Sequence, residues 1–130
     1  ERYPEMLTKR KKMIEKMDAA FADINVTVLN HYGKNHASSG HLYIVRLLGK
    51  TREQTNKIIE MMAERGIATN VHYKPLPMMT AYKKMGFDIK DFPNAYHMFE
   101  NEITLPLNTK MTMEDVDYVI ADFVDIVKSF

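Results

Sequence analysis

The residues with the clearest chemical potential are His72, Tyr73 and Lys74, which follow one another directly. An imidazole, a phenol and an ammonium can all form hydrogen bonds, and the ammonium can also pair with a phosphate. Pro75 and Pro77 come next; each fixes its own φ and biases the preceding residue towards an extended conformation. The pattern predicts a stiff loop that carries three polar groups, which makes it a candidate binding loop.

This loop should follow a short strand at Ile67 to Val71, and loops at the ends of strands commonly carry ligand-binding groups. Taken from the residues alone, however, a rigid turn with His72 and Tyr73 at the edge of the core is the preferred interpretation. No glycine-rich nucleotide-binding turn, phosphate loop or nucleophile elbow accompanies the loop in the sequence.

Three histidines, His31, His36 and His41, are spaced five residues apart, which raises the question of a metal site. No acidic residue lies among them, and residues 30 to 40 are polar, small and rich in glycine and serine. The composition of this segment predicts a mobile surface loop, and no metal-binding residue is expected in the chain.

The composition is that of an ordinary globular domain, with 45% apolar and 27% charged residues over 130 positions. Lys+Arg 18 against Asp+Glu 17 gives a net charge of +1, which provides no global field for nucleic acid. Zero cysteines exclude disulfides and fit a reducing cytoplasm, and no apolar run is long enough to span a membrane. The chain begins at Glu1 rather than at a methionine, as a piece of a longer protein would.

Apolar periodicity and turn residues predict the secondary structure. The Thr51 to Arg65 helix has the strongest signals, because Thr51 and Gln54 form a capping box and Gly66 suits a left-handed stop. Further helices are expected at Tyr3 to Ala22, Met78 to Met85, Asp91 to Glu102 and after Thr112. Strands are expected at Val26 to Leu29, at Ile103 to Leu107 and, covered on both faces, at His41 to Leu48. The fold class is therefore α+β, with two layers in which three or four short, mostly antiparallel strands pack under helices.

Seven segments, in this order and spacing, resemble the carboxy-terminal domain of nucleotide-sugar aminotransferases of the DegT–DnrJ–StrS family, which depend on pyridoxal phosphate (PLP). They are the entry helix, the His41-Leu42-Tyr43 strand, the helix ending at Gly66-Ile67, the His72-Tyr73-x-Pro75 loop, the Phe92 to Tyr96 helix start, the Leu105-Pro106-Leu107 strand and the Thr112-x-Glu114-Asp115-Val116 helix. Two positions depart from the family pattern: Thr104 replaces the usual serine, and Pro77 stands where relatives often have histidine.

The resemblance implies that residues 1–130 form the single small domain of a fold-type I PLP enzyme, whose cofactor lysine lies in a larger amino-terminal domain absent here. The whole enzyme would be a cytoplasmic homodimer that transfers an amino group, usually from glutamate, to a keto sugar nucleotide in polysaccharide or related sugar biosynthesis. His72, Tyr73 and, less directly, Lys74 would bind the sugar or its phosphates, and no catalytic or cofactor-binding residue would lie in this chain. Dehydratases of the same family remain an open branch, and a free-standing ferredoxin-like binding or regulatory module is the alternative.

Eleven methionines exceed what a small core needs, and methionine is common on adaptable contact surfaces. We therefore expect an exposed apolar face where the larger domain would dock, formed by Met6, Met13, Met17 and the Met78-Met79 segment. The separated chain should self-associate through this face.

Overall fold

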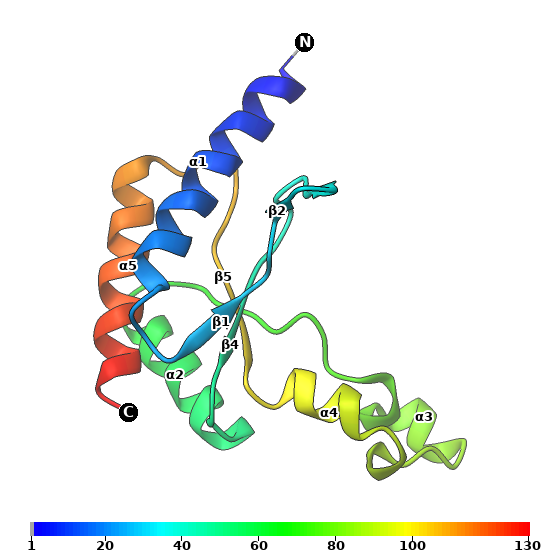
Figure 1. Ribbon diagram of the computed structural model, residues 1–130. Helices are drawn as coiled ribbons and strands as arrows, with labels where there is room; N and C mark the ends of the chain where they lie inside the picture. The colour runs from blue at the N-terminus through cyan, green and yellow to red at the C-terminus, as the bar shows by residue number, and fades with distance from the viewer. Residues whose placement is uncertain (1) are drawn as a thin grey trace.

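The computed structural model describes residues 2–130, which form a small antiparallel sheet with helices on one side and a projecting arm on the other (Figure 1). The α-helices are α1 (Tyr3–Phe21), α2 (Arg52–Glu64), α3 (Thr80–Lys84), α4 (Pro93–Phe99) and α5 (Met113–Lys128). The strands are β1 (Val26–Val28), β2 (Tyr32–Gly33), β3 (His36–Ala37), β4 (Tyr43–Leu47) and β5 (Glu102–Leu105), and two short 3-10 turns are η1 (Leu76–Met78) and η2 (Ile89–Asp91).

The main sheet has the strand order β1-β4-β5, with both neighbouring pairs antiparallel. In its register Val45 lies opposite Val28 on one side and Ile103 on the other. On the outer side of β5, Asn70 forms an isolated bridge with Thr104, so the segment after α2 returns to the sheet edge. The predicted α+β class is confirmed.

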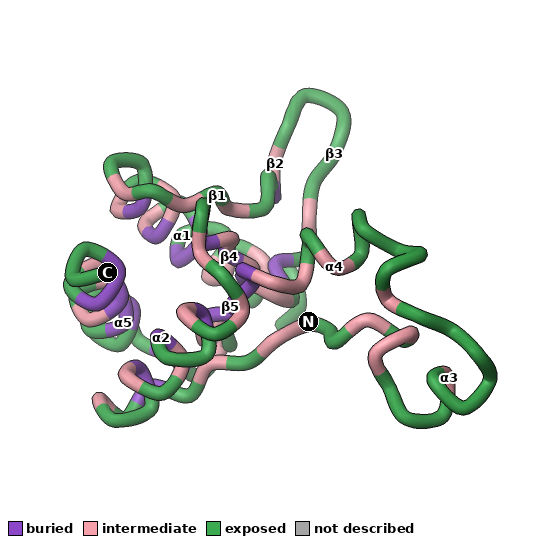
Figure 2. Tube along the Cα trace, turned by 90° about the horizontal axis from the view of Figure 1, so that it is seen from below, coloured by how far each residue is buried: buried purple, intermediate pink, exposed green. Residues whose placement is uncertain are grey.

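The hydrophobic core lies between one face of this sheet and helices α1, α2 and α5 (Figure 2). Alternation along β4 and β5 sends Tyr43, Val45 and Leu47, together with Ile103 and Leu105, into the core. Each side chain of this size that is removed from water contributes about 1.5–3 kcal/mol to stability. None of the helices within residues 2–130 combines the length and the apolar composition that a bilayer crossing requires.

Local sequence signals account for the helix ends. Thr51 and Gln54 form the predicted capping box of α2, and Gly66 has a φ of 73°. The amide of Ile67 donates to the carbonyl of Met62 at 2.9 Å, which makes the predicted left-handed stop a Schellman ending. The helix predicted after Thr112 is α5, and Thr112 caps it by accepting a hydrogen bond from the backbone N–H of Asp115.

The segment predicted as a mobile loop, residues 30 to 40, contains the β2–β3 hairpin, in which Tyr32 pairs with Ala37. His31 at its base is buried rather than exposed, because its ring packs on Tyr43 of the central strand. The position is supported by a hydrogen bond from the Ser38 amide to the carbonyl of His31, at 2.8 Å. The prediction of a surface loop was therefore wrong for His31, although His36 is exposed.

Two strand predictions also need correction. Residues 67 to 71 do not form a regular strand; the bridge at Asn70 is their only pairing in the part of the chain that the structure describes. The central strand β4 is fully buried on one face only, because Ile44 and Arg46 on the other face are partly exposed. Arg46 satisfies its guanidinium by donating to Asn101 and to the carbonyl of His97.

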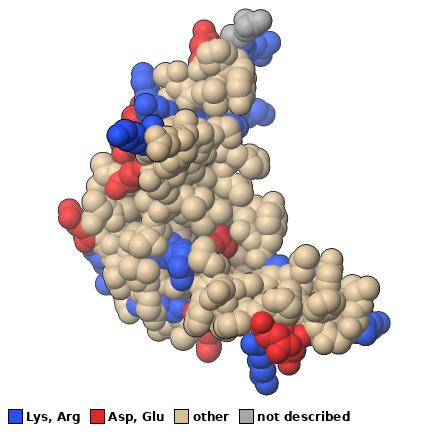
Figure 3. Space-filling model, turned by 45° about the vertical axis from the view of Figure 1, so that its right-hand side comes forward, with Lys and Arg blue, Asp and Glu red and all other residues tan. Residues whose placement is uncertain are grey.

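Residues 76 to 99, which we call the arm, contain η1, α3, η2 and α4 and project away from the core (Figures 1 and 3). Not one residue of the arm is buried. Its exposed apolar side chains are those of Leu76, Met79, Met85, Phe87, Phe92 and Met98.

Large apolar side chains are therefore exposed in the arm, but only some of the methionines predicted for the docking face are exposed. Met13 and Met17 are completely buried, because the apolar stripe of α1 faces the sheet and α5 rather than solvent. Met6 and Met79 are exposed and Met78 is partly exposed, as expected for a contact surface.

Candidate functional site

His72 lies beside the face of the sheet that the three core helices leave uncovered. Its backbone N–H donates to Oε2 of Glu102 at 3.1 Å, and its Nδ1 is 2.9 Å from Oγ1 of Thr104. The Thr104 hydroxyl in turn donates to Oε1 of Glu102 at 2.7 Å. The two residues of β5 thus hold both the backbone and the ring of His72.

The positions of Glu102 and Thr104 follow from the alternation of β5. Ile103 and Leu105 point into the core, so Glu102 and Thr104 point to the opposite face. They are nevertheless only 4% and 6% exposed. Since a buried carboxylate is stable only with partners, its two hydrogen bonds to His72 and Thr104 are part of what allows Glu102 to occupy this place.

Two arginines are neighbours of Glu102 in the structure. Arg46 is opposite Glu102 in the β4–β5 register. Arg52 donates from Nη1 to the carbonyls of Phe99 and Glu102, at 2.9 and 3.3 Å, and its guanidinium carbon lies 4.9 Å from the centre of the Phe99 ring. Burial lowers the pKa of Arg52, and the negative charge of Glu102 acts in the opposite direction. Arg52 thus contacts Glu102 through the backbone carbonyl, and the Arg46 guanidinium is engaged by Asn101 and His97.

Tyr73 and Lys74 are exposed, in contrast to His72. The rings of His72 and Tyr73 meet edge to face, with centroids 4.7 Å apart and planes at 80°. The peptide bond that joins these two residues is cis. The structure therefore brings His72 and Tyr73 together, whereas no hydrogen bond or ion pair within residues 2–130 fixes the side chain of Lys74.

Two pockets share His72 as part of their wall. The first, of about 280 Å³, is mainly apolar and is lined by Leu29, Ile44, His72, Tyr73, Pro75, Ala95, Met98, Phe99 and Glu102. The second, of about 310 Å³, is more polar and includes His41, Thr69, Asn70, His72 and Thr104. A ligand with an apolar face and several hydroxyl groups would find both kinds of contact around one imidazole.

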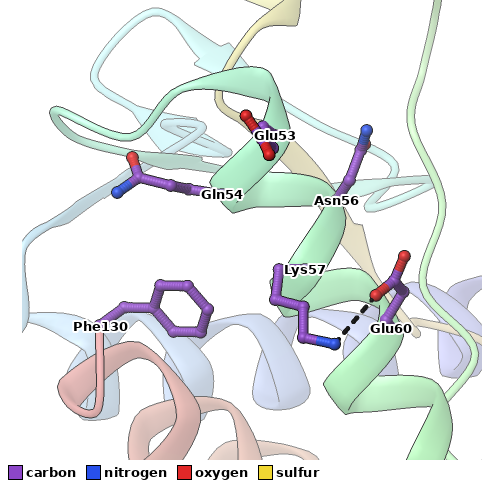
Figure 4. Close-up of a pocket in the computed structure, with 6 residues that line it drawn as sticks. All are labelled: Glu53, Gln54, Asn56, Lys57, Glu60 and Phe130. Carbon is purple, nitrogen blue, oxygen red and sulfur yellow. Dashed lines mark hydrogen bonds and ion pairs between the residues drawn. The ribbon is translucent and has the colours of Figure 1, made fainter.

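A larger hollow lies elsewhere, on the outer face of α2 near the chain end (Figure 4). It is lined by Glu53, Gln54, Asn56, Lys57, Glu60 and Phe130. The ammonium group of Lys57 already forms an ion pair with the carboxylate of Glu60, at 3.2 Å. These charged groups are exposed to solvent and do not converge on a common point. This hollow therefore does not have the features of a binding site.

The three histidines considered for a metal do not come together as ligands. Residues 2–130 contain no group of three or more His, Cys, Asp or Glu side chains arranged to hold a metal ion. His36 is engaged with the carbonyl of Asn30, His31 is buried against Tyr43, and His41 lines the second pocket.

Sequence reasoning missed Glu102 and Thr104 as site residues. The sequence analysis placed Glu102 at the end of a helix running from Asp91, whereas α4 ends at Phe99 and β5 begins at Glu102. The signal was present in the alternation of Glu102, Ile103, Thr104 and Leu105, in which polar and apolar residues take turns.

Comparison with known proteins identifies one family. The model of the DegT/DnrJ/EryC1/StrS aminotransferase family matches residues 1–124. Spore coat polysaccharide biosynthesis protein SpsC of Bacillus subtilis is 33% identical over 134 residues, which cover 98% of this chain and 33% of SpsC.

Solved structures of two aminotransferases are also similar to this chain. Spr1654 of Streptococcus pneumoniae, assigned as a sugar aminotransferase, is 48% identical in its apo form, with a TM-score of 0.95, covering 98% of this chain and 32% of that one. PseC of Helicobacter pylori, an aminotransferase involved in the biosynthesis of pseudoaminic acid, is 28% identical with a TM-score of 0.85, covering 99% of this chain and 34% of PseC. The chain thus spans about a third of the length of these relatives. It belongs to the DegT/DnrJ/EryC1/StrS aminotransferase family.

Proposed function

We propose that this chain is the carboxy-terminal small domain of a longer PLP-dependent aminotransferase that moves an amino group, from glutamate, to the keto group of a nucleotide-linked sugar. The observation that carries the proposal is the likeness to Spr1654, at 48% identity over 98% of this chain and a third of that protein. Spr1654 has been solved in PMP and PLP forms, and SpsC is named for spore coat polysaccharide biosynthesis.

The cofactor belongs in the remainder of the enzyme. PLP needs a lysine for its Schiff base, and the two pockets that meet at His72 have no lysine in their walls within residues 2–130. Lys74, the nearest in sequence, is exposed and lines neither pocket. When bound in the larger domain, PLP would supply the electron sink for amino transfer.

The role of this chain is then to bind and orient the sugar. His72 is held by Glu102 and Thr104 and contacts Tyr73, so these two rings are placed to meet the same substrate. Lys74, unpaired in residues 2–130 and at the surface, is suited to a phosphate of the nucleotide. We assign the sugar contacts to His72 and Tyr73 and a phosphate contact to Lys74.

The arm supports the domain assignment. A 24-residue segment with no buried residue and six exposed large apolar side chains would be poorly placed in a free-standing module. In the parent enzyme it would lie against the larger domain or the second subunit of a homodimer. We place this enzyme in the cytoplasm, for which a chain without cysteine is suited.

The test is to express the full-length protein and incubate it with PLP, glutamate and a panel of nucleotide-linked keto sugars. Formation of 2-oxoglutarate together with an amino sugar of the expected mass would support the proposal. A dehydrated sugar without consumption of glutamate would instead assign the enzyme to the dehydratases of this family, and no turnover of any sugar would contradict both.

A further inference from the structure

We propose that Glu102 and Thr104 act as positioning residues that hold the His72 ring in its Nδ1–H form, leaving the Nε2 lone pair as a hydrogen-bond acceptor for a substrate hydroxyl. The tautomer follows from contacts within this chain and does not depend on the proposed function. The identity of the ligand group does rest on the proposed function. It specifies that His72 binds a hydroxyl group of the sugar rather than a phosphate.

The direction of the hydrogen bonds follows from counting protons. The Thr104 hydroxyl has one hydrogen, which it donates to Oε1 of Glu102 over 2.7 Å. Its oxygen can then only accept at the 2.9 Å contact with His72 Nδ1, so this nitrogen must carry a hydrogen. In the neutral ring the second nitrogen, Nε2, is consequently the acceptor.

This direction has the Glu102 carboxylate as the acceptor, and the contacts of its two oxygens match that role. Oε2 already accepts the backbone N–H of His72, and Oε1 accepts the Thr104 hydroxyl, so both carboxylate oxygens are used as acceptors. Arg46 lies opposite Glu102 in the β4–β5 register, and Arg52 donates to the backbone carbonyl of Glu102.

The arrangement has a consequence for the ligand. Within residues 2–130 no hydrogen bond engages Nε2 of His72, although the residue borders both pockets. A neutral imidazole held in this form can accept a hydrogen bond at Nε2 but cannot donate one there. Phosphate oxygens only accept, whereas a sugar hydroxyl donates. His72 is therefore matched to a hydroxyl, and the phosphate contact is left to Lys74.

The first test is a long-range proton–nitrogen NMR correlation spectrum of this chain labelled with nitrogen-15, recorded in a buffer alkaline enough for neutral rings. We expect His72 to show a protonated Nδ1 and an unprotonated Nε2, the opposite of the form that a histidine side chain free in water favours. An Nε2–H ring in the wild-type chain would overturn the proposal, whatever the enzyme does.

Two substitutions separate positioning from a general effect on the fold. Thr104→Ser keeps the hydroxyl and should keep the Nδ1–H form, whereas Thr104→Val, of similar shape, should return His72 to mainly Nε2–H. An unchanged tautomer in Thr104→Val would contradict the role of Thr104. If this variant does not fold, the wild-type and Thr104→Ser spectra still show which tautomer His72 adopts.

The second test uses the full-length enzyme. Thr104→Val should lower kcat/KM for the sugar by about threefold to tenfold, as loss of one oriented hydrogen bond would, and Thr104→Ser should lose less. Because Thr104 acts through His72, adding Thr104→Val to His72→Ala should cause no further loss. Additive losses would show that Thr104 acts by another route.

A third measurement distinguishes the hydroxyl from the phosphate. The nucleoside diphosphate portion of the sugar substrate, used as a competitive inhibitor, should bind His72→Ala and wild type equally within about twofold. A loss of tenfold or more would show that His72 contacts the phosphate, which would overturn the ligand assignment. If the full-length protein transfers no amino group to any keto sugar, the proposed function fails, but the NMR result remains as a separate finding.

Discussion

His31 and Tyr43 lie face to face, with ring centroids 5.8 Å apart and ring planes only 7° from parallel. Tyr43 is anchored by its hydroxyl, which donates to Asp18 at 2.7 Å, whereas Nε2 of His31 is buried without a hydrogen-bond partner in residues 2–130. Burial lowers the pKa of His31, and the negative charge of Asp18 only partly opposes this. The folded chain thus favours the neutral ring.

The stability of the chain should therefore decrease in mild acid. As pH falls through 6.5, the ordinary pKa of histidine, the unfolded chain takes up a proton at His31 that the folded chain resists. The free energy of unfolding should fall by up to about 1.4 kcal/mol per pH unit and level off below the lowered pKa of the folded state. Urea unfolding at a series of pH values measures this. His31→Gln should show a shallower decline, and an equally steep one would mean that other groups cause it.

In the full-length enzyme, His72→Ala or Tyr73→Phe should weaken turnover of the nucleotide sugar. Loss of a substrate hydrogen bond costs about 0.5–1.5 kcal/mol, or about 1.5–3 kcal/mol with a charged partner, which corresponds to roughly a threefold to hundredfold drop in kcat/KM. The glutamate half-reaction should be largely unchanged, because this loop is assigned to the sugar. Stopped-flow measurements of the two half-reactions separate these effects. Equal slowing of both, or slowing of the glutamate half alone, would remove the loop from the sugar site.

The separated 130-residue chain should neither bind PLP specifically nor transaminate. The pockets beside His72 have no lysine in their walls among the described residues, so random surface amines are the available reactants. Incubation with PLP, reduction with borohydride and peptide mapping should find low labelling spread over several lysines. A single lysine labelled to saturation would contradict the placement of the cofactor in another domain.

The separated chain should also self-associate through the arm. Met85 and Met98 are 74% and 54% exposed, so Met85→Lys and Met98→Lys together should disrupt this contact without affecting the core. We expect dimer dissociation constants at least about tenfold higher for this variant by sedimentation velocity.

Tyr3 offers a matched control, because it is 61% exposed but belongs to α1 rather than to the arm. Tyr3→Lys should leave the association unchanged. A wild-type chain that remains monomeric at all concentrations would mean that the arm does not mediate self-association.

The parts of this molecule that could be predicted from the sequence are those governed by neighbouring residues. The capping box at Thr51 and the stop at Gly66 depend on groups within five positions of one another, and both were confirmed. The α+β class followed from the periodicity of the segments, and the family from motifs in register.

The parts that could not be predicted depend on contacts between distant residues. The carboxylate of Glu102 meets the backbone of His72 from 30 positions away. Likewise, His31 is buried only because the chain folds back onto Tyr43. Met13 and Met17 fit either a core or a contact surface by composition, and only the packing of α1 against the sheet decides between them. The direct contact of His72 with Tyr73 was equally inaccessible, since an extended segment would have separated the two rings.

The absence of buried residues in the arm, residues 76–99, has a thermodynamic consequence for the mainly apolar pocket beside His72. Ala95, Met98 and Phe99 of α4 form one of its walls, yet the helix holding them is secured by few apolar contacts. Segments of this kind open locally at a small fraction of the free energy needed to unfold the whole domain. In hydrogen exchange, amides of α4 should therefore lose protection long before those of β4. Covering the arm would slow this opening, so association with a subunit or domain and closure of this pocket would be linked equilibria.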